Sequence, residues 1–535
     1  MTSLLRSTRT MALGTLASRA TGFLRTAVVA LVLGVGGVGV AFNVANTAPN
    51  IVYELLLGGV LSSVVVPLLV RAAKEGEGEG LAYAQRLLSL TVLALGAASL
   101  LLVLLAPLIV DAYLDDGTDP ATRDLAVLLA RFFLPQVLFY GAGAVMGAYL
   151  NTRGRFGPPM WAPVLNNLVV IVTGLVFLLM PGPDELSARS VTGAQTAVLG
   201  IGVTLGIVAQ TVALVPALRA TGFRFLPRLD LRGAGLGSAG RLAKWVLLFV
   251  LANQLAYLVV VNLATRASAD TPGRGYPSYV YAFVLWQLPH AVVAVSVITA
   301  LLPRMSSSAA DGRTDELRAQ LSQGLRLVLV VLVPAAVAYV VLGRSIATLV
   351  FGYYQVSIEE ARFIGVLLGV FALGLVPYSI YQLQLRSFYA MQDTRTPTLV
   401  NLAVNATLVV VDVVLFAVLP ADLRVVGLAA GQAASFLVGL LVVSAVLRRR
   451  TGGLDGAVVV RTGVRCLAAC LPPALLALGV GALVARLLGE GPLGAAVTLV
   501  TAGAVLLGGY LVLVTRMRVP EVQQALRPVL ARLGR

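Results

Sequence analysis

The 535-residue chain is 58% hydrophobic and only 12% charged, which excludes an ordinary soluble domain, where about 25% of residues are charged. Forty lysines and arginines against 24 acids give a formal net charge of +16. In so apolar a chain this excess indicates membrane topology and contact with anionic lipid rather than with nucleic acid. We therefore expect a polytopic membrane protein with no nucleic-acid partner and no cleavable signal peptide.

Hydrophobic runs close to the roughly 20 residues that a spanning helix needs recur along the whole chain. They predict an all-α polytopic membrane protein of about fourteen transmembrane helices. The second run is unusually long and contains Pro49, Pro67 and the pair Gly58–Gly59, which predicts a bent or interrupted helix. The connecting segments are too short for a folded domain, so function has to reside mainly in the helices. The predicted spans are 11–34, 39–69, 87–110, 124–150, 160–180, 196–218, 240–264, 278–302, 324–345, 361–388, 397–417, 425–447, 461–485 and 492–515.

Lysines and arginines are distributed unevenly over the segments between these spans. If the N-terminus is cytoplasmic, the segments on that side hold 29 of the 40 basic residues and the opposite segments hold nine. Because basic residues accumulate in cytoplasmic loops, this distribution predicts cytoplasmic termini and an even number of spans. The remaining two basic residues, Arg19 and Arg25, lie inside the first span.

Two similarities between the halves of the chain indicate an internal repeat. LPQVLFYGAGAVMGAYLNTRG, from Leu134, resembles VPYSIYQLQLRSFYAMQDTRT, from Val376, and matches Pro135 with Pro377 at an offset of 242. A second similarity relates the prolines of span 2 to those of span 8. Both join spans that are six apart, which predicts a parallel repeat with a site between two six-helix lobes, as in many transporters.

The repeat predicts a division of the chain into three parts. An N-lobe is expected over 1–220 with spans 1 to 6, and a C-lobe over 221–450 with spans 7 to 12. Residues 451–535 are expected to add two helices outside the repeat and a short cytoplasmic tail.

Arg19 and Arg25 are costly residues, because insertion scales assign each roughly 2.5–3.5 kcal/mol near the centre of a membrane helix. At 1.5 Å per residue both lie too deep to reach the headgroups. Six residues apart on a straight helix, they face different sides unless Thr21 or Gly22 allows a bend. Two interpretations remain open. One is a wet cationic cavity that binds an anion, and the other is an intramolecular pair such as Arg25 with Glu54.

Three other ionisable residues lie well inside predicted spans. Glu54 is expected to neutralise an arginine or to take up a proton during transport. Asp412 either binds a coupling cation or lies near a loosely defined span end. His290 follows Pro289, which is expected to break the helix, and a polar role at that break is favoured over a proton relay.

The sequence contains little that indicates an enzyme. Cys466 and Cys470 lie four residues apart on an apolar helix and are expected to be packing residues, with no metal or cofactor site. A polyprenyl-dependent membrane glycosyltransferase would need a catalytic acid near the outer surface, but the acids of YLDDGTDP at 113–120 lie in a short loop rich in turn residues. P-loop, HExxH and usable GxSxG motifs were not found. We therefore expect a transporter and not an enzyme.

Five stretches resemble the MurJ (MviN) family of lipid II flippases, in the multidrug/oligosaccharidyl-lipid/polysaccharide exporter superfamily. The patterns S-R-x-x-G-x-x-R and RSFYA-x-x-D-T-x-T-P are fairly specific in combination. Abundant Ala, Val, Leu, Gly and Arg with almost no Lys is similar to high-GC bacterial proteins, and YELLLGGVLSSVVVP resembles actinobacterial members. The five stretches are SRATGFLRTAVVALVLG, APNIVYELLLGGVLSSVVVPLL, GAYLNTRGRFGPPMWAPVLNN, LPHAVVAVSVITALLPRMS and LRSFYAMQDTRTPT.

The resemblance implies a bacterial cell-membrane protein with fourteen helices, a central cationic cavity and a groove for a lipid tail at the last two helices. Its substrate would be lipid II, the undecaprenyl-diphosphate-linked disaccharide-pentapeptide. The arginines of the family's first helix match Arg19 and Arg25 and are expected to meet the diphosphate. Membrane lipids and cell-wall synthesis proteins are the other expected partners. The expected substrate-binding residues are Ser18, Arg19, Arg25, Asn50 and Glu54, with Asp412 as the candidate for ion coupling.

The chain departs from well-studied relatives where they carry further cavity arginines. The matching stretches of the second and eighth helices read Tyr53-Glu54 and Phe283-Val284, and Val40 replaces an acid before the second helix. The cavity is therefore expected to be less positive than in those relatives.

We expect a flippase that moves lipid II from the inner to the outer leaflet by alternating access, driven by the membrane potential or an ion gradient. A flippase for another polyprenyl-diphosphate-linked saccharide remains open. So do a drug or organic-cation antiporter of the same superfamily and a polyprenyl-dependent membrane glycosyltransferase. An antiporter for cations would need acids in its cavity, whereas this chain has arginines.

Overall fold

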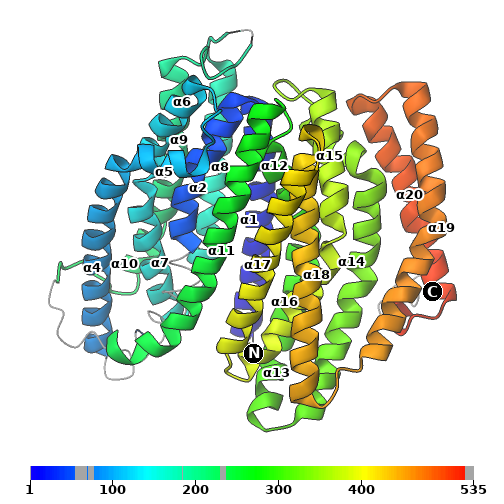
Figure 1. Ribbon diagram of the computed structural model, residues 1–535. Coiled ribbons are helices and arrows are strands. Elements are labelled where there is room, and N and C mark those ends of the chain that lie inside the picture. The colour runs from blue at the N-terminus through cyan, green and yellow to red at the C-terminus, as the bar shows by residue number, and fades with distance from the viewer. Residues whose placement is uncertain (1, 55–68, 70–76, 184, 229–235, 524–535) are drawn as a thin grey trace. The chain divides into compact units, whose positions relative to one another are not determined.

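The computed structural model describes residues 2–54, 69, 77–183, 185–228 and 236–523, and every regular element in that part of the chain is a helix (Figure 1). Among these residues, twelve helical segments are long and apolar enough to span a membrane, and a bent pair of helices raises the number to thirteen. They coincide with thirteen of the fourteen predicted spans. The second predicted span, 39–69, lies in part outside the described residues; its first part is helical and continues through Pro49.

Contacts between helices divide the chain into two compact units, unit 1 (residues 1–277) and unit 2 (residues 278–535). The division predicted from the sequence, with limits at 220 and 450, stays a prediction. The helices of unit 1 are α1 (Thr2–Leu33), α2 (Gly37–Glu54), α4 (Glu77–Leu104), α5 (Ala106–Tyr113), α6 (Pro120–Phe133), α7 (Gln136–Thr152), α8 (Gly157–Leu179), α9 (Gly193–Val212), α10 (Val215–Arg219) and α11 (Leu236–Asp270).

Small residues and hydrogen bonds pack the helices of unit 1. A Cβ atom on Gly202 of α9 would come within 2.3 Å of the Thr173 hydroxyl of α8, so this crossing requires glycine. Thr265 of α11 donates its hydroxyl hydrogen to the carbonyl of Tyr113, at the end of α5, over 2.7 Å. This bond attaches α11 to unit 1.

Unit 2 contains one π-helical turn between two α-helices, and its last two helices pack on its longest one. Tyr510 of α20 donates to the carbonyl of Val330 in α14 over 2.6 Å. A buried cluster that includes Leu342, Ala477 and Leu506 fills the space between α14, α19 and α20. The helices are α12 (Tyr276–Pro289), η2 (His290–Ala294), α13 (Val295–Ala310), α14 (Thr314–Phe351), α15 (Ile358–Ala372), α16 (Leu375–Ala390), α17 (Arg395–Val418), η3 (Ala421–Leu423), α18 (Arg424–Thr451), α19 (Gly456–Leu488) and α20 (Pro492–Arg516).

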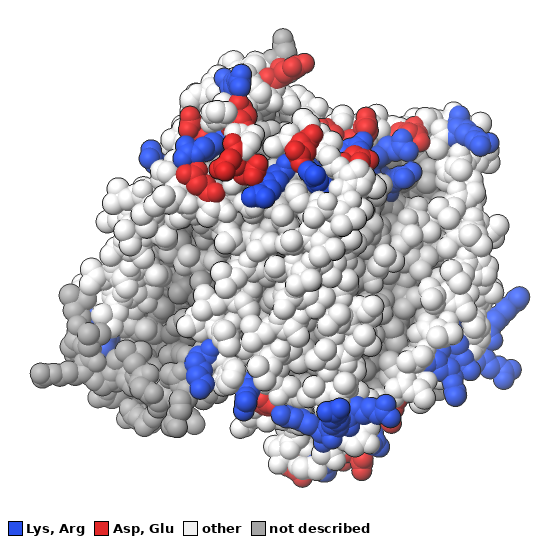
Figure 2. Space-filling model, viewed as in Figure 1, with Lys and Arg blue, Asp and Glu red and all other residues white. Residues whose placement is uncertain are grey.

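Charged side chains gather at the helix ends, with uncharged side chains between them (Figure 2). In unit 2 the two ends differ. The end with the α13–α14, α16–α17 and α18–α19 turns holds thirteen of the seventeen arginines in residues 278–523, and the opposite end holds four. This asymmetry continues the pattern that the loops show in the sequence.

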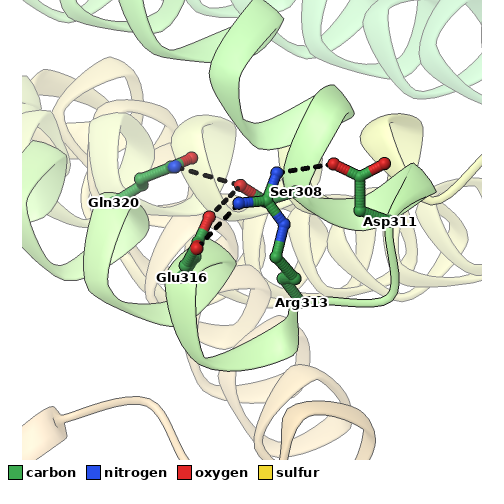
Figure 3. Close-up of polar contacts among 5 residues, drawn as sticks. All are labelled: Ser308, Asp311, Arg313, Glu316 and Gln320. Atoms are coloured by element: carbon green, nitrogen blue, oxygen red, sulfur yellow. Dashed lines mark hydrogen bonds and ion pairs between the residues drawn. The ribbon is translucent and has the colours of Figure 1, made fainter.

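The α13–α14 turn is closed by a polar network at the basic end (Figure 3). Arg313 donates to Asp311 over 2.5 Å and to Glu316 over 2.8 Å. Ser308 donates to Glu316 over 3.2 Å and accepts from Gln320 over 3.1 Å. The ion pairs are half-exposed and screened by water, so the network serves mainly to order the turn.

Local structure recurs between the units. In unit 1 a break separates α6 from α7, and Gly154 in the turn after α7 has φ +71°. In unit 2 a break separates α15 from α16, and Gln392 in the turn after α16 has φ +58°. Gln392 lies 238 positions after Gly154. This offset is four residues, or about one helical turn, smaller than the offset of 242 between the similar sequences. The parallel repeat stays a prediction that this recurrence supports.

The turn with Gln392 also contains the D-T-x-T-P motif. The Asp393 carboxylate accepts hydrogen bonds from the Thr396 N–H over 3.0 Å, from the Thr396 hydroxyl over 2.6 Å and from the Arg450 guanidinium over 2.5 Å. Burial opposes ionisation of this carboxyl, but the hydrogen bonds outweigh it and hold the pKa of Asp393 below its usual value. This part of the motif therefore fixes the start of α17 to the end of α18.

We expect Asp393→Asn to lower the stability of the protein at neutral pH by about 1 kcal/mol, as for the loss of a helix-capping carboxylate. A group whose pKa is depressed on folding stabilises the protein above its unfolded pKa of about 3.9, and this stabilisation is lost as the pH falls through the folded value. The difference in melting temperature in detergent should therefore persist from neutral pH to about pH 5 and shrink below about pH 4. Arg449→Gln, at an exposed site nearby, is the control. A deficit independent of pH would show that the carboxylate charge is not involved.

Candidate functional site

Both intramembrane arginines lie on α1, which is a continuous helix. Arg19 is exposed and Arg25 is half-buried. Thr21 donates its hydroxyl hydrogen to the carbonyl of Ala17 over 2.8 Å, a type of bond that satisfies a polar side chain in a membrane helix and often bends it. Within the described residues, neither arginine forms an ion pair.

The rotation of α1 is fixed by its contact with α8. Asn167 of α8 donates its side-chain N–H to the Ser18 carbonyl over 3.2 Å and to the Thr21 hydroxyl over 3.0 Å. Further along, a Cβ atom on Gly174 of α8 would come within 2.7 Å of Val28, so the two helices approach closely. Ser18 thus contributes its main-chain carbonyl to packing, and α8 determines where the arginines point.

The two arginines lie beside one pair of tyrosines. Arg19 is close enough to Tyr53 of α2, and Arg25 to Tyr140 of α7, for electrostatic interaction with their hydroxyl groups. The two tyrosine rings contact each other, with 4.5 Å between their centroids. The Tyr140 hydroxyl also makes a long contact of 3.5 Å with the side-chain oxygen of Asn50. The structure therefore brings the two arginines and Asn50 together around an aromatic pair, despite the spacing of the arginines along α1.

Glu54 is held by an amide and not by an arginine. Gln254 of α11 donates to Glu54 Oε2 over 3.2 Å. Arg25 and Glu54 do not pair in the structure, so the predicted intramolecular alternative is not formed there. The cluster of unit 1 therefore contains two cations and one exposed acid, with a net positive charge when all three are ionised.

Sequence reasoning missed four residues of this cluster: Tyr53, Tyr140, Asn167 and Gln254. Each is a polar side chain within an apolar helix, which was the available signal. An uncharged polar side chain costs far less to insert into a membrane than an arginine does. Its position deep within a span therefore does not by itself indicate a functional site.

Asp412 lies in unit 2, six residues before the last residue of α17. Its side chain is fully buried, and neither carboxylate oxygen has a hydrogen-bond partner among the described residues. A Cβ atom on Gly431 of α18 would come within 1.9 Å of Asp412 Oδ1, so the glycine leaves room for the carboxylate. An unpartnered buried acid is expensive, and such residues within membrane helices usually mark an ion or proton pathway.

Contrary to the prediction from the sequence, Pro289 does not break the helix; α12 continues through a π-helical turn into α13, and His290 lies in that turn. It begins the π-helical turn η2, directly after Pro289. Its Nδ1 lies 2.9 Å from the Ser379 hydroxyl, whose hydrogen is donated to the Leu375 carbonyl over 2.8 Å. His290 and Ser379 are thus hydrogen-bonded, with the direction set by the histidine tautomer. This contact gives His290 a polar partner at the π-helical turn.

The described residues give no sign of a metal or catalytic centre. No group of three or more His, Cys, Asp or Glu side chains among them could hold a metal ion, and Cys466 and Cys470 are buried and unbonded to each other. Two of the three acids of the loop at 113–120 pair with arginines: Asp115 with Arg266 over 2.9 Å, and Asp119 with Arg189 over 2.6 Å. These ion pairs are consistent with a surface loop.

Relatives of known family cover most of the chain. The model of the family described as lipid II flippase MurJ matches residues 29–501. A probable lipid II flippase MurJ from Rhizobium meliloti (strain 1021) is 29% identical over 424 residues, which cover 76% of this chain and 75% of the relative. The lipid II flippase MurJ of Burkholderia cenocepacia is 28% identical over 411 residues, which cover 75% of this chain and 76% of the relative.

Solved structures have the same fold. A lipid II flippase MurJ in an inward closed conformation superposes with a TM-score of 0.73 at 18% identity and covers 95% of this chain and 99% of that chain. An inward-facing multidrug resistance transporter of the MATE family in the MOP superfamily has a TM-score of 0.66 at 15% identity, covering 83% and 99%. With a family match from residue 29 to residue 501, the chain belongs to the MurJ lipid II flippase family and is a multi-pass membrane transporter, not an enzyme.

Proposed function

We propose that this protein translocates lipid II from the inner to the outer leaflet of the bacterial cell membrane by alternating access between two lobes. Membership in the flippase family supports the reaction class. The observation that carries the substrate chemistry is the pair Arg19 and Arg25, held inside a membrane helix without an ion pair among the described residues. A diphosphate headgroup would offset the cost of keeping two cations there.

The family match begins after both arginines, so their roles are proposed from the geometry of unit 1. Arg25 contacts the diphosphate, since its planar guanidinium can bind phosphate through two hydrogen bonds. Arg19 contributes a second cation beside the same tyrosine pair. Asn50 and Glu54 lie next to these tyrosines and face the headgroup, and the Ser18 carbonyl holds α1 in place.

A second candidate is a flippase for another polyprenyl-diphosphate-linked saccharide. It is favoured by Glu54, which stands where well-studied relatives are expected to carry a cavity arginine and which is paired with Gln254. An organic-cation antiporter fits the cluster less well, because two of its three charged groups repel a cation.

Asp412 is proposed as the coupling residue, through which a cation or proton gradient would drive the cycle. Its burial and its two unpartnered oxygens support this role. The membrane potential is the alternative drive.

Both termini are proposed to be cytoplasmic, which the basic helix ends of unit 2 support. The scarcity of lysine supports an actinobacterial-type origin. Membrane lipids and cell-wall synthesis proteins, which consume the product at the outer surface, are the proposed partners.

Two introduced cysteines test the topology. Arg155→Cys at the α7–α8 turn should react with a membrane-impermeant maleimide only after permeabilisation, whereas Asp116→Cys at the α5–α6 turn should react in intact cells. The native Cys466 and Cys470 are buried and should give little background. The opposite labelling pattern would show that the orientation is inverted.

The function is tested with purified protein in vesicles that carry lipid II in one leaflet only. We expect protein-dependent transfer to the other leaflet, and accumulation of lipid II in the inner leaflet of cells depleted of the protein. The same vesicles with another polyprenyl-diphosphate-linked saccharide distinguish the second candidate. Transfer of that lipid alone would assign the protein to it, and transfer of neither would refute both.

A further inference from the structure

Unit 1 contains a groove that is not lined by the arginines of α1. A groove of about 810 Å³ lies between α4, α7 and α10, within the range of about 300–1,000 Å³ typical of small-molecule sites. Its walls are mostly apolar and include Leu88 and Val92 of α4, Ala142 and Met146 of α7, and Val215 of α10. These residues belong to segments that can span a membrane, so lipid chains surround this part of the molecule.

One wall of the groove is an extended segment that is fixed to α4. Gly222, at φ +79°, reverses the chain after α10, a conformation that glycine adopts without strain. Gln85 then donates to the Arg224 carbonyl over 2.7 Å, and the Arg228 N–H donates to the Ser89 hydroxyl over 3.0 Å. Gln85 and Ser89 are both buried, so this wall is a built part of unit 1 and not a loose loop.

Two arginines line the groove where α10 ends. Arg219 is the last residue of α10 and Arg224 lies in the extended wall, and both are exposed. Within the described residues neither makes an ion pair. An apolar groove with two exposed cations at one end is complementary to a molecule with an apolar chain and an anionic head.

We propose that this groove binds one anionic phospholipid, with an acyl chain along α4 and α7 and its phosphate on Arg219 and Arg224. A free phosphate would leave the apolar walls unused, and a zwitterionic lipid would gain less from the two arginines. By the proposed topology this lipid belongs to the inner leaflet, which is the anionic one. The groove shares α7 with the proposed diphosphate site, but its lining residues on that helix are Ala142 and Met146 and not Tyr140, and none of them belongs to α1 or α2.

The experiment measures lipid binding to the full-length protein by native mass spectrometry in detergent, with phosphatidylglycerol, phosphatidylcholine and glycerol phosphate as probes. Phosphatidylglycerol should bind at least about tenfold more tightly than phosphatidylcholine, and glycerol phosphate should not bind. The double variant Arg219→Gln, Arg224→Gln should lose about tenfold to thirtyfold in affinity for phosphatidylglycerol, from about 1 kcal/mol per arginine. Ala142→Phe, which fills the groove, should weaken both phospholipids.

The matched control is Arg155→Gln, Arg449→Gln, which removes the same charge from exposed sites outside the groove. It should leave binding of phosphatidylglycerol unchanged. If the control loses as much affinity, the effect comes from general surface charge and the proposal is wrong. Equal affinity for the two phospholipids would also overturn it, and so would unchanged phospholipid binding by Ala142→Phe. Melting temperatures confirm that each variant is folded.

Discussion

Arg25→Ala is expected to weaken lipid II binding about tenfold to a hundredfold and to slow transfer between leaflets. A charge-assisted hydrogen bond to phosphate is worth about 1.5–3 kcal/mol, and each 1.4 kcal/mol corresponds to a factor of ten. Arg25 forms no ion pair among the described residues, so its guanidinium is available for such a bond. Arg25→Lys should recover only part of the affinity, because lysine keeps the charge but loses the planar fork. Binding is measured with purified protein, and transfer with the vesicle assay.

Two controls separate a binding role from a structural one. Arg155→Ala, at an exposed turn, removes a charge of the same sign and should bind lipid II as wild type does. Glu54→Gln should not rescue Arg25→Ala, since Glu54 is held by Gln254 and not by Arg25. If Arg25→Ala inserts normally and binds and transfers lipid II as wild type does, Arg25 is not the anion site. Rescue by removal of Glu54 would instead show that the two residues pair during the cycle.

Asp412→Asn is expected to reduce gradient-driven transfer of lipid II at least about tenfold while the melting temperature stays the same or rises. A buried carboxylate without hydrogen bonds destabilises a fold, and a neutral amide of the same shape is less costly to bury. A residue kept only for packing would show the reverse, a loss of stability without a specific loss of transport. The measurement is transfer in vesicles with and without imposed gradients of protons and sodium ions.

The matched control for this residue is Asp422→Asn, an exposed acid in the turn η3 that follows the same helix. It should transport lipid II normally under every gradient. If Asp412→Asn also keeps the full response to both gradients, coupling does not pass through Asp412. If transport falls equally with and without gradients, Asp412 is needed for the movement of the lobes and not for coupling to an ion gradient.

The repeat illustrates what the sequence shows only in part. Similar stretches predict that span 4 and span 10 correspond, yet the turns that follow these spans align four residues, about one helical turn, away from the offset of the similar residues. Apolar sequences tolerate such a shift, because many neighbouring registers of a membrane helix have nearly equal hydropathy. Backbone conformation at Gly154 and Gln392 defines the register more sharply.

The sequence by itself determined the positions of the spans, the depth of Arg19 and Arg25, and the resemblance to a flippase family. These properties depend on local hydropathy and on short motifs, so they need no knowledge of neighbouring helices. Only the tertiary structure decided that Tyr140 of α7 lies beside Arg25, that Glu54 bonds to a residue 200 positions away, and that Asp412 has no partner. Such contacts depend on the rotation of each helix. That rotation is set by interactions between helices, such as those of Asn167 and Gly174 of α8 with α1, which local sequence does not encode.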